Sequence, residues 1–106
     1  RVAYLYQELH PAVLRTVKRV IDAAHAEGKW VGMCGEMAGN PLAAPLLMGM
    51  GLDEFSMNSN RILQIRSLIK KMNTRQLQLL VHRALNAQSA PEVAELVRTA
   101  IPELNR

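Results

Sequence analysis

Apolar residues recur at intervals of three and four between residues 13 and 24, with charged residues on the opposite side. The apolar set is Val13, Leu14, Val17, Val20, Ile21 and Ala24. This period is that of one face of an α-helix. Pro11 suits the first helical turn, and Gly28 suits the left-handed position that ends a helix. The pattern predicts an amphipathic helix that begins at Pro11 and ends before Gly28.

Two short apolar segments predict β-strands, because neither is long enough for a stable helix. Residues 29–33 predict a buried strand, which places Cys34 at its C-terminal end. Residues 52–57 predict a second short strand, which Gly51 separates from the preceding element.

The segment between the two strands predicts a mostly apolar helix. Asn40 and Pro41 are typical of a helix start, and apolar residues continue to Gly49. Pro45 cannot donate a backbone hydrogen bond, so it would disrupt a helix that began at Pro41. We therefore expect the regular part of this helix to begin two or three residues after Pro41.

The chain from residue 59 on predicts three further helices. The apolar stripe of the first is Ile62, Ile65, Leu68, Ile69 and Met72. Lys70 and Lys71 are expected in its last turn, where positive charge suits the helix dipole. Thr74 is the expected N-cap of the second helix, and Ser89 with Glu92 has the pattern of a capping box at the start of the third.

Strands that alternate with helices predict an α/β fold with parallel strand pairing and right-handed crossovers. Two parallel strands alone leave both sheet edges open and cannot cover the helices around them. We therefore expect residues 1–106 to be the end of a larger α/β domain, with about two parallel strands, flanking helices and two additional C-terminal helices.

Composition narrows the class of protein further. The 106 residues are 49% hydrophobic and 21% charged, which predicts one packed core. No basic-then-apolar leader is present and no apolar run reaches the roughly 18 residues of a membrane span, so secretion and membrane insertion are not expected. A single cysteine beside six methionines favours a reducing, cytoplasmic location. The net charge of +4 is dispersed and the aromatic residues are not interleaved with basic ones, so nucleic-acid binding is not expected.

The only cysteine lies in residues 32–36, Gly-Met-Cys-Gly-Glu. Cys34 cannot form a disulfide within the chain, and Gly32 and Gly35 would let the backbone approach a ligand closely. A lone cysteine at a strand end is more often a small buried apolar residue than a catalytic one. The residues alone leave both interpretations open.

Three segments carry a more specific signal. They are Ala-His-Ala-Glu-Gly-Lys-Trp at 24–30, Gly-Met-Cys-Gly-Glu-Met-Ala-Gly at 32–39 and Gly-Met-Gly-Leu-Asp-Glu-Phe-Ser-Met at 49–57. In order and spacing they resemble the C-terminal part of enzyme I of the bacterial sugar phosphotransferase system, the phosphoenolpyruvate-protein phosphotransferase family. The resemblance runs from about Leu5 to the C-terminal helix.

The resemblance implies that the chain is the C-terminal portion of a TIM-type (β/α)8 barrel that binds phosphoenolpyruvate, its two strands being the seventh and eighth. It implies that a phosphoryl group passes to a protein histidine and that Cys34 is the proton donor to the pyruvate enolate left behind. A free thiol, with a reference pKa of about 8.5, is mostly protonated at neutral pH and suits this role. Gly35 and Glu36 are candidate substrate-binding residues, although a turn role for Gly35 and a capping or solvated role for Glu36 stay open.

The resemblance also implies ligands and partners outside these residues. The family's Mg2+ ligands, phosphate-binding arginines and phosphorylated histidine lie upstream, and their motifs do not occur in this chain. We therefore expect no metal site in these residues and no turnover by them alone. The implied partners are a histidine-containing phosphocarrier protein, bound through a separate N-terminal domain, and a second copy of the chain, bound through the C-terminal domain.

Other suggestive residues have simpler interpretations. His10, His25 and His82 lie outside the family's phosphorylation motif and are expected at helix ends or surfaces. Asp53 and Glu54 have no histidine or third acid near them in sequence, so we expect structural or loop roles. The six methionines lie in apolar runs and are expected to fill the core.

Two other functions stay open. A pyruvate phosphate dikinase or phosphoenolpyruvate synthase shares the Cys-Gly-Glu motif, although residues 52–57 and the short helical tail favour enzyme I. The other function is that of a non-catalytic helical interaction module. Replacement of Cys34 in the full-length protein separates the last function from the enzymes, because only an enzyme that uses the thiol would lose activity.

Overall fold

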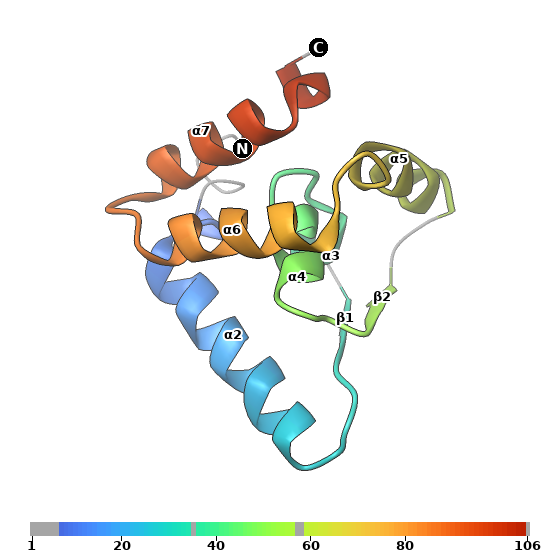
Figure 1. The fold of residues 1–106 in the computed structure, drawn as a ribbon. Coiled ribbons are helices and arrows are strands. Elements are labelled where there is room, and N and C mark those ends of the chain that lie inside the picture. The colour runs from blue at the N-terminus through green and yellow to red at the C-terminus, as the bar shows by residue number, and fades with distance from the viewer. Residues whose placement is uncertain (1–6, 35, 57–58, 106) are drawn as a thin grey trace.

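The computed structural model describes residues 7–34, 36–56 and 59–105, and within them the chain forms an α/β fold in which helices predominate (Figure 1). The elements in chain order are α2 Pro11–Ala26, β1 Gly32–Cys34, α3 Glu36–Gly39, α4 Ala44–Gly49, β2 Glu54–Ser56, α5 Ser59–Ile69, α6 Thr74–Leu85, α7 Ala90–Ala100 and the 3-10 helix η1 Pro102–Asn105. The predicted α/β class and order of helices and strands are confirmed, with α3 as an additional short helix.

The two strands pair in parallel, as the alternation of elements predicts. The register sets Gly32 opposite Glu54, Met33 opposite Phe55 and Cys34 opposite Ser56. The expectation that the first strand is buried is wrong for this chain, because both strands alternate between exposed and half-buried residues. The half-buried residues Met33 and Phe55 pack against the main core cluster.

Helix α2 has the predicted bounds, and Gly28 beyond it has a left-handed φ of 72°. His10 is its N-cap residue, and its Nδ1 accepts a hydrogen bond of 3.1 Å from the Ala12 amide. This agrees with the helix-end position expected for His10. Only part of the predicted apolar face is buried: Leu14 and Ile21 are buried, whereas Val13 and Val20 are 41% and 56% exposed.

Helix α4 begins at Ala44, three residues after Pro41, which confirms the delay expected from Pro45. The prediction that Asn40 caps this helix is wrong, because the N-cap residue is Ala43 and it makes no side-chain capping bond. Asn40 is buried in the preceding turn, where its Oδ1 accepts a hydrogen bond of 3.0 Å from the Leu42 amide.

The C-terminal helices match the prediction except at their ends. Helix α5 ends at Ile69, so Lys70 and Lys71 follow the helix and do not lie in its last turn. The N-cap of α6 is Asn73 and not Thr74, because the Asn73 side chain accepts from the Gln76 amide and forms a full capping box.

Ser89 caps α7 as predicted, by accepting a hydrogen bond from the Glu92 amide. The reciprocal bond of the expected capping box is displaced by one residue. The Glu92 side chain accepts a hydrogen bond of 3.2 Å from the Gln88 amide, one position before the cap.

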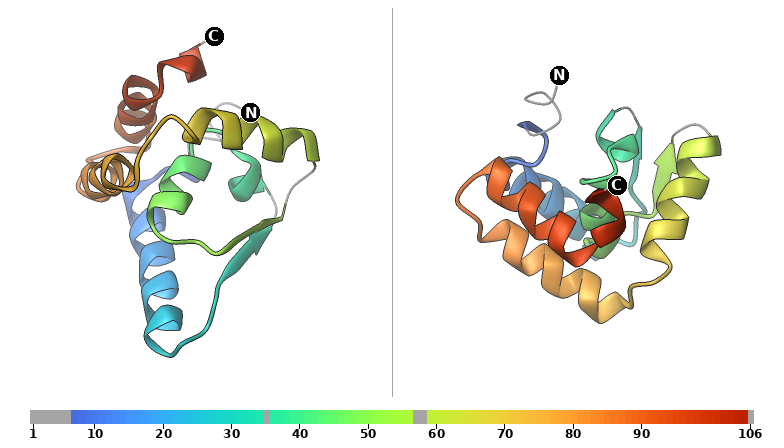
Figure 2. Two further views of the ribbon diagram at one scale, coloured as in Figure 1. Left: turned by 45° about the vertical axis from the view of Figure 1, so that its right-hand side comes forward. Right: turned by 90° about the horizontal axis from the view of Figure 1, so that it is seen from above.

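The core forms where α4 packs against α6, and α7 also packs against α6 (Figure 2). Leu46 and Leu47 of α4 are fully buried, and Val93 and Val97 of α7 close the same cluster. Gly49 lets α4 approach α6 closely, because a Cβ atom there would lie 2.9 Å from the Leu77 carbonyl oxygen.

No helix among the described residues is long and apolar enough to cross a membrane.

Candidate functional site

Cys34 is the last residue of β1, as predicted, and its register partner Ser56 is the last residue of β2. Because the strands are parallel, both carboxyl ends meet at one edge of the sheet. Helix α3 begins two residues after Cys34 and contacts both strands. The end of the strand pair therefore brings together Cys34, Ser56 and the short helix α3. Ser56 gave no signal in the sequence, because its place beside Cys34 depends on the strand register.

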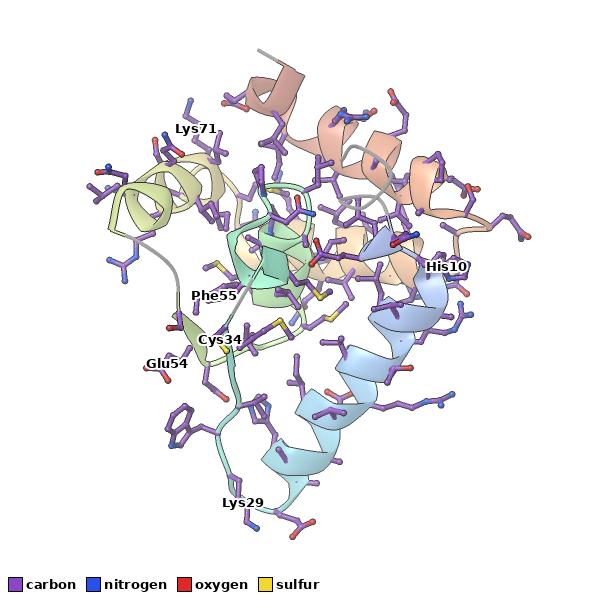
Figure 3. The ribbon with its side chains drawn as sticks, turned by 180° about the vertical axis from the view of Figure 1, so that it is seen from behind. His10, Lys29, Cys34, Glu54, Phe55 and Lys71 are labelled. Atoms are coloured by element: carbon purple, nitrogen blue, oxygen red, sulfur yellow. The ribbon has the colours of Figure 1, made fainter. Side chains whose placement is uncertain are left out.

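The thiol lies on the face of the sheet that points away from the helices. Met33 and Phe55 are half-buried and pack against the main core cluster. Their neighbours along each strand point to the opposite face, since successive side chains alternate. Cys34 and Glu54 are accordingly exposed on neighbouring strands (Figure 3). Cys34 is therefore not a small apolar residue buried in the core of this chain.

Gly32 was expected to let the backbone approach a ligand. In this chain the groups that lie close to its backbone are two side chains, those of Glu54 and Trp30. An added Cβ atom would lie 3.1 Å from Oε1 of Glu54 and 3.2 Å from Cζ3 of Trp30. Trp30 is 68% exposed at the start of the same strand face. The glycine thus allows two large side chains to lie against β1, two residues before Cys34.

Two of the predicted site residues cannot be placed. Gly35 and the side chain of Glu36 lie outside the described residues, although α3 begins at Glu36. Their proposed contact with substrate stays a prediction.

A hydrogen bond between two residues far apart in the sequence joins α2 to the segment that leads into β2. Nε2 of His25 lies 2.7 Å from Oδ2 of Asp53, and the same oxygen accepts a hydrogen bond of 2.8 Å from the Val31 amide. The hydrogen bond from His25 and then that from Val31 lower the pKa of Asp53 from its ordinary value of 3.8. The structural role expected for Asp53 is confirmed, and so is the helix-end position of His25.

Within residues 7–34, 36–56 and 59–105, no three His, Cys, Asp or Glu residues lie close enough together to hold a metal ion. These residues therefore do not fit the Mg2+ site that the family implies, and we assign no reaction step to a metal held by them.

Two hollows on the surface lie elsewhere. One of about 380 Å³ lies between α6 and α7, and one of about 290 Å³ lies between β2 and α5. Cys34 lines neither of them.

The α/β fold with its parallel strand pair is consistent with the family that the sequence matches. Residues 1–74 match the model of the PEP-binding domain of PEP-utilising enzymes. The chain belongs to this family.

Curated relatives refine the resemblance to one member of that family. The phosphoenolpyruvate-protein phosphotransferase of Listeria monocytogenes is 59% identical over 97 residues, which are 92% of this chain and 17% of the relative. The proteins of the same name from Enterococcus faecalis and Staphylococcus carnosus are 58% identical over 98 residues and 56% identical over 97 residues, each 92% of this chain and 17% of the relative. The chain thus spans about a sixth of the length of these relatives, and the resemblance of its three segments to that family is confirmed.

Proposed function

We propose that this chain supplies the proton donor of a phosphoenolpyruvate-protein phosphotransferase of the sugar phosphotransferase system. The observation that carries the proposal is the exposed thiol of Cys34 at the carboxyl end of a parallel strand. The identity to phosphotransferases on both sides of that residue favours this enzyme over the other PEP-utilising enzymes.

The arrangement of the strand pair supports a place in a (β/α)8 barrel. In such barrels the helices cover the outside of the sheet, and active-site residues come from the carboxyl ends of the strands. Here the core helices pack against the face that carries Met33 and Phe55, so the Cys34 face corresponds to the inside of the barrel. We assign β1 and β2 to the seventh and eighth barrel strands.

In the proposed reaction, the phosphoryl group leaves the enol oxygen of phosphoenolpyruvate and bonds to a histidine nitrogen on another domain. The P–O bond breaks and its electron pair stays with the enolate of pyruvate. The Sγ–H bond of Cys34 then breaks, its proton bonds to the methylene carbon, and the thiolate regains a proton from water. A general acid at the reacting carbon contributes roughly 10²- to 10⁴-fold in rate.

The other parts of the proposal depend on residues outside this chain. Mg2+ would stabilise charge on the phosphoryl oxygens and the enolate when bound by upstream residues. Gly35 and Glu36 follow the thiol directly, which suits contact with substrate. A histidine-containing phosphocarrier protein would accept the phosphoryl group, two copies of the C-terminal domain would associate, and the reaction would occur in the cytoplasm.

The experiment is replacement of Cys34 by Ser and by Ala in the full-length enzyme. We expect pyruvate formation from phosphoenolpyruvate to fall by at least about 100-fold, the lower limit of general-acid catalysis. Transfer from pre-phosphorylated enzyme to the carrier protein should not change, because it does not involve the enolate.

The control is Thr16→Ala, which removes an exposed hydroxyl on α2, away from the strand end, and should retain turnover. Full turnover by both Cys34 variants would refute the acid role and leave a non-catalytic interaction module as the better description.

A further inference from the structure

Asp53 fixes the strand pair at the end opposite Cys34. Its carboxylate accepts the Val31 amide hydrogen at 2.8 Å, and its own amide donates to the Val31 carbonyl at 3.0 Å. Two hydrogen bonds between the same two residues define how β2 lies along β1. Val31 immediately precedes Gly32, the first residue of β1.

His25 holds the Asp53 carboxylate in place from α2. The imidazole lies in the last turn of the helix and contacts the same carboxylate oxygen, Oδ2, at 2.7 Å. Gly51, with a φ of 95°, makes the left-handed turn that brings the chain back beside His25. The turn places Asp53 between the end of α2 and the start of β1.

The position of Cys34 depends on this register. A slip of one residue along β2 would move the thiol by about 3.3 Å relative to Ser56 and reverse the face on which the partner side chains lie. Displacement of a catalytic group by about 1 Å is enough to cost on the order of 100-fold in rate. With only three residues in each strand, the ladder itself supplies little to prevent such a slip.

We propose that His25 and Asp53 are positioning residues that hold Cys34 at the reacting carbon through Val31 and the register of the strand pair. The inference rests on the proposed function of Cys34. Neither residue touches substrate, and both act through β1 and β2.

The test uses the full-length enzyme with Asp53→Ala and His25→Ala. We expect kcat for pyruvate formation per active site to fall by about 10- to 100-fold with KM for phosphoenolpyruvate changed less than about threefold, because the residues expected to bind the phosphate lie upstream of this chain and are not displaced with the thiol. Active sites are counted by the amount of enzyme that phosphoenolpyruvate phosphorylates in a single turnover, so misfolded protein does not contribute.

A second measurement is one that a merely structural role would not change. Phosphoenolpyruvate with deuterium at one methylene position, converted in tritiated water, gives pyruvate whose methyl group reports the face of protonation. Wild-type enzyme should protonate one face. The Asp53 and His25 variants should give a mixture, because enolate that the thiol does not reach takes its proton from water on either face.

Conservative variants and a matched control complete the design. His25→Gln retains a donor toward Asp53 and should recover most of kcat and of the stereospecificity. Asp22→Ala breaks a contact of the same length on the same helix, the ion pair of the 56% exposed Asp22 with Lys18 at 2.7 Å, and it should behave as wild type.

The outcomes separate the two proposals. If the Cys34 variants lose activity but Asp53→Ala and His25→Ala keep wild-type kcat and stereospecificity, the positioning role is wrong and the acid role stands. If the Cys34 variants keep full activity, the acid role is wrong and the positioning role falls with it. Should Asp53→Ala give no folded enzyme, His25→Ala, which alters a residue with a 38% exposed side chain, decides the question.

Discussion

The contact between α4 and α6 predicts that Gly49→Ala destabilises the fold, although alanine is the better helix former. A Cβ atom at this position would lie 2.7 Å from Cγ2 of Val81 and 2.9 Å from the Leu77 carbonyl oxygen. Neither neighbour can move independently, because the oxygen belongs to the backbone of α6 and Val81 is a β-branched side chain that is 4% exposed. The two helices must therefore move apart.

The magnitude follows from two opposing effects. Overpacking in a filled core costs about 1–3 kcal/mol. Alanine in place of glycine inside a helix stabilises the folded state by roughly 0.5–1 kcal/mol. This gain is at its smallest for Gly49, because it is the last residue of α4. We expect a net loss of about 1–2 kcal/mol in the free energy of unfolding. With a urea m-value of about 1.5 kcal/mol per molar, the unfolding midpoint should fall by about 1 M.

The assay is urea unfolding followed by far-ultraviolet circular dichroism, with a double-mutant cycle. Val81→Ala removes one of the two close contacts, so it should cost less stability in the Gly49→Ala background than in the wild type. Gly28→Ala is the control, because Gly28 has a positive φ but no atom within 4 Å of an added Cβ, and Val81→Ala should not compensate it. A Gly49→Ala protein as stable as wild type, or strictly additive effects in the cycle, would refute the proposed clash.

Two further predictions concern Asp53 and the chain by itself. Because the pKa of Asp53 is lowered in the folded state, its charge stabilises the fold above the unfolded value of about 3.8, and this contribution is lost as pH falls through the lowered pKa. Asp53→Asn should therefore lower the urea midpoint near neutral pH, and its difference from wild type should shrink as the pH falls below 3.8; a pH-independent difference would contradict the assignment. The purified 106-residue chain should form no pyruvate from phosphoenolpyruvate and Mg2+ in a coupled dehydrogenase assay, since its described residues hold no metal cluster, and measurable turnover would contradict this expectation.

Local signals were sufficient to predict most helices and the direction of strand pairing. Pro11 and Gly28 mark the ends of α2, and Ser89 marks the start of α7, because each residue acts on backbone groups within a few positions of itself. Parallel pairing followed from the alternation of strands and helices. The N-cap of α6 was misplaced by one residue, since Asn73 and Thr74 can both cap and only the bond to Gln76 decides between them.

Burial was less predictable than secondary structure. Val13 and Val20 belong to the predicted apolar face of α2 but are exposed, because the elements packed on this helix cover only a narrower stripe that includes Leu14 and Ile21. Helix α3 was missed because four residues contain barely one helical turn and show no period. The pair of His25 and Asp53 was missed because 28 residues separate them in the sequence.

In the candidate site, too, the position of a residue along its strand was predictable from the sequence, whereas its neighbours in space were not. The sequence placed Cys34 at a strand end, but only the register shows which side chains share its face. Gly32, Glu54 and Ser56 lie with the thiol on the exposed face, whereas Met33 and Phe55 face the core.

An exposed sheet face with two open edges is costly for an isolated chain, because unpaired strand edges favour association. In the barrel that we propose, neighbouring strands would pair with both edges and the thiol would point into the interior. The open edges and the exposed face would thus place Cys34, in the role that we propose for it, in one part of a shared active site. In the positioning role that we propose, the hydrogen bonds of Asp53 to His25 and Val31 at the opposite end of the strands would hold the thiol of so short a pair in one position.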